Sequence, residues 1–133
     1  MKKSYKGLIY WLIGFLAAMF SLSFLPIENT KLITNLCILM CTAGVTLLLY
    51  IVYRYDKIYW INGVMYEDAV KWSRQQRDRF TWRHFEVFGK FLCLHIVFAL
   101  ISHFFNFPLW IIITVPTIGL IITAISTIRI KPE

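Results

Sequence analysis

The side chains best suited to chemistry lie inside long apolar runs of the chain. Asn35 occupies one such run, and His95, Ser102 and His103 share one face of another on a helical wheel. Polar side chains inside membrane segments are costly, so they mark ligand pathways, proton relays or hydrogen bonds between helices. We predict that these four residues form a polar intramembrane face that either binds a ligand or packs helices together.

A soft-metal site is the next possibility, because three cysteines lie in the same apolar runs. Cys37 and Cys41 are one helical turn apart, and Cys93 is close to His95 in the sequence. The Cys-x-x-Cys spacing of common metal sites is missing, and buried cysteine is also a good small packing residue. We therefore expect no metal, no cofactor and no disulfide framework.

Catalytic motifs are not evident in the polar parts of the chain. The sequence has no phosphate-binding loop, nucleophile elbow or His-Glu-x-x-His motif. The apolar runs contain no Asp or Glu, whereas small proton-coupled exporters usually need a carboxylate in the membrane. We predict no catalytic residue and favour a non-enzymatic protein, leaving the enzyme class open.

The elements that must position these side chains follow from the distribution of charge. Hydrophobic residues make up 59% of the 133 residues and charged residues 16%, against about 25% charged in a soluble domain. A membrane-spanning helix needs about 20 apolar residues. Four runs reach this length, and we predict a single four-span, all-α integral membrane domain, 1–133, with spans at about 7–25, 32–53, 87–105 and 107–128.

The loops set the arrangement of the four spans. Short connections after the first and third spans predict two helical hairpins. Of the 14 Lys and Arg residues, 12 lie in the two termini or the long join 54–86, and Lys90 lies one turn inside the third span, where its ammonium can reach the same side; only Lys31 lies in a loop on the opposite side. Basic loops stay on the cytoplasmic side. We predict a multi-pass protein of the cell (inner) membrane with both termini and the join in the cytoplasm.

The join contains a helical pattern with one apolar and one basic face. Trp72 lies on the apolar face, and Lys71, Arg74 and Arg77 lie opposite. We predict an amphipathic helix at the membrane interface, with these four residues docking on the membrane surface or on a partner. The alternative is a single helix from about Met65 to Phe105, continuous with the third span.

A turn signal precedes this helix. Asn62-Gly63 lies between aromatic arms, a pattern typical of a two-residue β-hairpin turn. The segment 58–66 is therefore predicted to be either a short hairpin or a plain turn that starts the helix.

Three functional classes remain at this stage. We favour a non-enzymatic accessory, interaction or immunity-type protein of a larger membrane system. The alternative is an oligomeric small transporter, flippase or channel, and the third class is a membrane enzyme acting on lipid. The net charge of +7 suits anionic lipid headgroups, so the expected partners are the bilayer and a membrane protein or a second copy. We expect no nucleic-acid binding.

Overall fold

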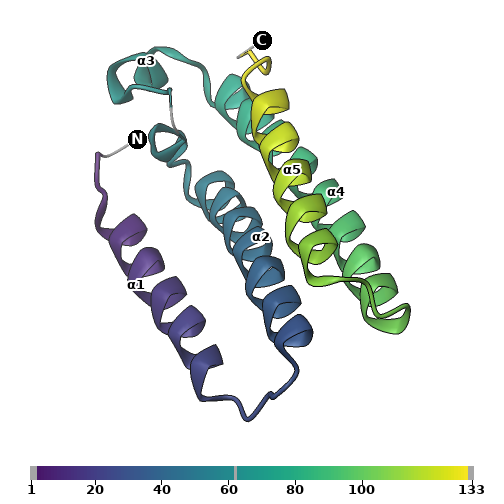
Figure 1. Cartoon of the computed structure of the whole chain (residues 1–133). Coiled ribbons are helices and arrows are strands. Elements are labelled where there is room, and N and C mark those ends of the chain that lie inside the picture. Colours follow the sequence, from purple (N-terminus) through teal and green to yellow (C-terminus); the bar gives the residue numbers. More distant parts are fainter. Residues whose placement is uncertain (1–2, 62, 132–133) are drawn as a thin grey trace.

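The computed structural model describes residues 3–61 and 63–131, and it is helical over 81% of the chain with no strand in the described part. Two short 3-10 helices and a six-residue helix accompany four long helices (Figure 1). The elements are α1 (Lys6–Ser21), η1 (Leu22–Phe24), α2 (Thr30–Tyr55), η2 (Ile58–Trp60), α3 (Tyr66–Lys71), α4 (Arg74–Phe104) and α5 (Leu109–Thr127).

The four long helices are long and apolar enough to cross a membrane, as the sequence predicts. Their ends follow local chemistry. The Asn29 side chain accepts hydrogen bonds from the first backbone N–H groups of α2, and Pro108, which cannot donate, precedes α5. The third predicted span, 87–105, corresponds to the second half of α4, which is 31 residues long.

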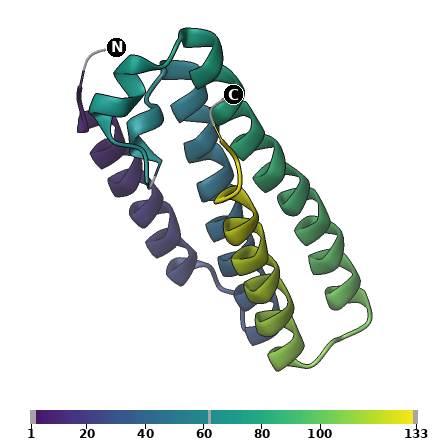
Figure 2. The ribbon, with the colours of Figure 1, turned by 90° about the horizontal axis from the view of Figure 1, so that it is seen from above.

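The central helix is α2, which contacts both α4 and α5, while α4 and α5 also contact each other. The first helix is different: α1 lies against α2, separated from α4 in both views, and has no buried residue (Figures 1 and 2). Both described chain ends and α3 lie at one end of the molecule, and the connections 22–29 and 105–108 lie at the other (Figure 1).

The predicted amphipathic helix is divided. The short α3 ends at Lys71, Trp72 is extended, and α4 begins at Arg74 after the Ser73 cap. The prediction of Trp72 on one face, with Lys71, Arg74 and Arg77 opposite, assumed an uninterrupted helix, and that assumption is wrong. From Arg74 onward the alternative holds, because the polar segment and the apolar span form one continuous helix.

The turn at 58–66 contains no strand among its described residues. It begins with η2, and Gly63 has φ +88°, a left-handed conformation that favours glycine. Asn62 lies outside the described residues. Of the two predicted forms, the described residues match the plain turn, which leads directly into α3.

Candidate functional site: a polar seam and a folded cap

Polar side chains line the contact between α2 and α4, and we call this line the seam. Asn35 Nδ2 donates to Ser102 Oγ at 2.9 Å, and Thr42 Oγ1 lies 3.0 Å from His95 Nδ1. Further along, the Thr46 hydroxyl donates to the Thr42 carbonyl of its own helix at 2.9 Å, and its Oγ1 lies 3.5 Å from the Phe88 carbonyl of α4. The structure therefore brings three of the four predicted face residues together across two helices.

The fourth predicted residue, His103, lies outside the seam. Its side chain is exposed, whereas Asn35, His95 and Ser102 are each at most 4% exposed. A helix turns about 100° per residue, so Ser102 returns to within about 20° of His95 while His103 is about 80° away. Placing His103 on the same face was wrong for this reason.

Thr42 joins the backbone of α2 to His95. Its Oγ1 lies 3.1 Å from the Ile38 carbonyl and 3.0 Å from His95 Nδ1, and its one hydrogen can be donated to either group. His95 Nε2 is buried and has no partner among the described residues.

Asn35 Oδ1 is the second buried seam atom without a partner in the described part of the chain. Its amide nitrogen is bound to Ser102, so only the acceptor half of the side chain is unsatisfied. An unsatisfied acceptor of this kind costs about 1–3 kcal/mol, and a water or a ligand with a donor group would remove that cost.

His95 also borders a hollow of about 340 Å³ between α4 and α5. Pro116, which has no N–H to donate within α5, and Thr123 line the same hollow. Most of its wall is apolar: Phe91, Leu94, Phe98, Val115 and Ile122. The hollow could accept a small apolar molecule, with the imidazole as its polar contact.

The second structured region is the cap, which we define as residues 56–73. It has a core of its own, in which Ile58 and Ala69 are fully buried beside Phe80 of α4. Trp72 packs against this core and is only partly exposed. Burying apolar side chains contributes about 25 cal/mol per Å², so the cap is a folded body and not a loose loop.

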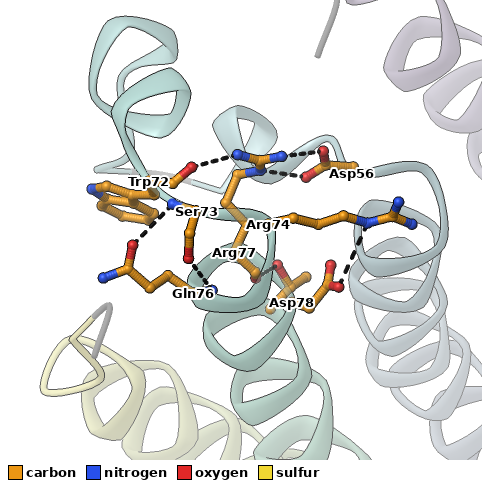
Figure 3. Close-up of polar contacts among 8 residues, drawn as sticks. Asp56, Trp72, Ser73, Arg74, Gln76, Arg77 and Asp78 are labelled. Atoms are coloured by element: carbon orange, nitrogen blue, oxygen red, sulfur yellow. Dashed lines mark hydrogen bonds and ion pairs between the residues drawn. The ribbon is translucent and has the colours of Figure 1, made fainter.

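An ion pair fastens the cap to α2 and α4 (Figure 3). Arg77 donates from two nitrogens to the two oxygens of Asp56, each at 2.8 Å, and from the third to the Trp72 carbonyl at 2.6 Å. Asp56 ends α2 in the left-handed conformation that turns the chain toward the cap. Bidentate pairs of this geometry are strong and specific.

The four residues predicted to dock on a membrane or a partner differ in how far their side chains are exposed. Lys71 and Arg74 are exposed, with 74% and 84% of their side chains accessible. Arg77 is 12% exposed and bound to Asp56, and Trp72 belongs to the cap core. The prediction of Arg77 and Trp72 as surface contacts needs correction, since the break at Ser73 turns both toward the protein interior.

The sequence contains a motif that predicts the break between α3 and α4 at Ser73. Ser73 and Gln76 form a capping box, in which Gln76 N–H donates to Ser73 Oγ at 3.2 Å and Ser73 N–H donates to Gln76 Oε1 at 2.9 Å (Figure 3). A Ser followed three residues later by Gln is a recognised start of a helix. This spacing, overlooked in the wheel, separates α3 from α4.

The N-terminal segment closes the cap from the other side. The Ser4 backbone N–H donates to the Tyr59 hydroxyl at 2.7 Å, and the Ser4 carbonyl accepts from the same hydroxyl and from Trp60 Nε1. Lys3 pairs with Glu67 at 3.4 Å. The pKa of Glu67 is lowered by a hydrogen bond to its own backbone N–H and then by Lys3.

Neither a metal centre nor a known relative adds to this geometry. Among residues 3–61 and 63–131, no group of three or more His, Cys, Asp or Glu could hold a metal ion. Comparison with protein-family models, curated proteins and solved structures finds no match to the chain. The functional argument therefore depends on the seam, the cap and their surroundings.

Proposed function

We propose that the protein is a non-enzymatic accessory subunit of a larger membrane system, and that its cap binds an acidic surface of a membrane-protein partner. The observation that carries the proposal is the cap itself. It has its own buried core and is fastened by the Asp56–Arg77 pair. It presents Lys71 outward next to Arg74, the first residue of α4, and these two exposed cations pair on the surface with Asp68 and Asp78. A rigid surface that carries exposed cations favours a specific partner because little ordering is needed on binding.

The proposed topology is a multi-pass protein of the inner membrane, made of two helical hairpins, with cap and termini in the cytoplasm. The described chain ends and α3 lie at one end of the molecule (Figure 1), and basic residues concentrate in those segments. This distribution supports the orientation through the positive-inside rule.

Photo-cross-linking in native membranes tests the proposal. A photoreactive residue replaces Arg74, and the matched control replaces Leu94, an apolar α4 residue that is 69% exposed. We expect a discrete protein adduct from position 74 and none of the same mass from position 94. The adduct is then identified and the partner purified, so that binding can be measured directly.

Charge-reversal variants then test the proposal quantitatively, through their affinity for the purified partner. We expect Lys71→Glu combined with Arg74→Glu to weaken binding at least about tenfold through loss of charge complementarity, with helical content unchanged. Arg54→Glu, an exposed residue of α2 outside the cap, is the matched control and should bind normally. Equal binding by all three proteins, or no adduct at position 74, would refute the proposal.

The second candidate function is an oligomeric transporter or channel, and the buried unpartnered atoms favour it. Asn35 Oδ1 and His95 Nε2 are buried polar atoms inside the apolar bundle without described partners, which suits water or a passing solute. Flux in proteoliposomes tests it, with His95→Ala and Asn35→Ala as the variants. Loss of flux with intact helical content supports this function, and no flux in the wild-type protein excludes it.

A further inference from the structure

A hollow lies between α2, α4 and α5 at the cap end. Its volume is about 850 Å³, within the range of about 300–1,000 Å³ common for ligand pockets. Leu49 and Phe88 form part of the wall, Ala124 and Ile128 line it from α5 and its C-cap, and Trp60 and Trp72 border it from the cap side. No acidic side chain is among the described residues that line it.

The segment after α5 gives this cavity a charged margin. Ile128, which is 80% exposed, and the half-buried Ile130 line the cavity, and the exposed Arg129 and Lys131 alternate with them in the sequence. Ile130 also packs against the cap core beside Trp72. An apolar hollow and a pair of cations therefore lie next to each other where the chain leaves α5 and meets the cap.

We propose that this cavity binds one anionic phospholipid, with an acyl chain inside and the phosphate on Arg129 and Lys131. The apolar wall matches a hydrocarbon chain, and the two cations match an anionic headgroup. Tryptophan rings such as Trp60 and Trp72 are enriched at the level of the headgroups, where the two parts of a lipid meet. The site depends on membrane insertion and not on the protein partner proposed above.

One polar group of the wall is compatible with this occupant. His84 Nδ1 lies 2.9 Å from the Phe80 carbonyl, which can only accept, so Nδ1 is the donor. His84 lines the cavity, and the bond to Phe80 leaves its other ring atoms free of that carbonyl. A hydrocarbon chain can contact the ring carbons, and no charged wall residue has to be desolvated.

Two cavity tryptophans allow the lipid to be detected by fluorescence. A variant that keeps only Trp72, with the other four tryptophans changed to Phe, is reconstituted in vesicles of zwitterionic phosphatidylcholine. Phosphatidylglycerol or phosphatidylcholine with brominated acyl chains is then added in equal amounts. We expect brominated phosphatidylglycerol to quench Trp72 with about a tenfold preference over brominated phosphatidylcholine.

Three controls separate the site from the general lipid environment. A variant that keeps only Trp82, which is 46% exposed, reports on the surrounding lipid. Quenching of Trp82 should not change when Arg129 and Lys131 are replaced by Gln. Arg129→Gln combined with Lys131→Gln should abolish the preference at Trp72. Ala124→Phe, which fills the cavity, should reduce quenching of Trp72 by both lipids.

Several results would overturn the proposal. Equal quenching of Trp72 by both lipids removes the anionic selectivity, and a preference that survives both Gln substitutions removes the proposed phosphate contacts. Absence of quenching shows that no acyl chain enters the cavity.

If the single-tryptophan variants do not fold, native mass spectrometry takes the place of the fluorescence experiment. It compares the wild-type protein with the Arg129→Gln, Lys131→Gln double variant, each with the two unmodified lipids. One retained phosphatidylglycerol in the wild type only is then expected, and equal retention refutes the site.

Discussion

Helices α1 and α4 are both long and apolar, yet they are held in different ways. Helix α4 buries six residues and shares the seam and the Asp56–Arg77 pair with its neighbours. Helix α1 buries none, and the segment just before it is tied to the cap through Lys3 and Ser4. Apolar character places a helix in a membrane, but polar and close-packed contacts decide which helices form one unit. We conclude that α2, α4 and α5 form the structural unit and that α1 lies against it.

The largest expected effect comes from removing the ion pair on the α4 side. Arg77→Gln leaves Asp56 without its partner, and breaking a largely buried pair costs about 3–5 kcal/mol. We expect a loss of this order in the free energy of unfolding, measured by circular dichroism in mixed detergent micelles. Arg74→Gln, whose pair with Asp78 is exposed, should change stability by no more than about 0.5 kcal/mol. Equal effects of the two substitutions would show that the pair does not hold the cap.

Glycine substitutions test the contact between α1 and the structural unit. A Cβ at Gly44 would collide with the Phe15 ring of α1, and a Cβ at Gly119 would collide with the Phe91 ring of α4. Overpacking of this kind typically costs about 1–3 kcal/mol, although ring rotation lowers the cost. We expect Gly119→Ala to destabilise the whole protein and Gly44→Ala to release α1 alone.

The readout for this series is a disulfide between cysteines introduced into α1 and α2, together with global unfolding. Gly14→Ala is the matched control, because nothing lies within 4 Å of its Cβ position. Reduced cross-linking with unchanged unfolding is expected only for Gly44→Ala. If Gly44→Ala also lowers global stability, α1 belongs to the same cooperative unit as α4.

A smaller effect is expected along the seam. A double-mutant cycle of Asn35→Ala and Ser102→Ala should give a coupling energy of about 0.6 kcal/mol, the average for hydrogen bonds between membrane helices. The same cycle with Thr42→Ala and His95→Ala should give a similar value. Coupling well above about 1.7 kcal/mol would show that the seam contributes more than ordinary helix packing.

The smallest effect concerns the tie between the N-terminal segment and α3. The pKa of Glu67 is lowered in the folded state, so its contribution is present above the unfolded pKa and is lost as the pH falls through the folded value. Carbon-13 NMR of Glu67 should show the lowered pKa, and Lys3→Gln should move it upward. An unchanged titration in Lys3→Gln would show that Lys3 does not act on this carboxylate.

The sequence predicts the long helices well because each depends on local composition. Runs of apolar residues identify the four helices, and the heptad spacing of His95 and Ser102 identifies the seam face. His103 was misplaced since an eight-residue step departs by about 80° from one helix face. The pairing of Asp56 with Arg77 could not be predicted, because it depends on the left-handed end of α2 and on the break at Ser73 acting together.

The Asp56–Arg77 contact also sets an order of events while the chain is being made. The guanidinium is 21 residues later in the chain than the carboxylate, and the ribosome adds about 5–20 residues per second. Arg77 is therefore synthesised about 1–4 s after Asp56, and the interval between Ser4 and Tyr59 is longer. The cap is consequently assembled after α1 and α2 have emerged, which leaves a brief interval in which those two helices must remain in place without it.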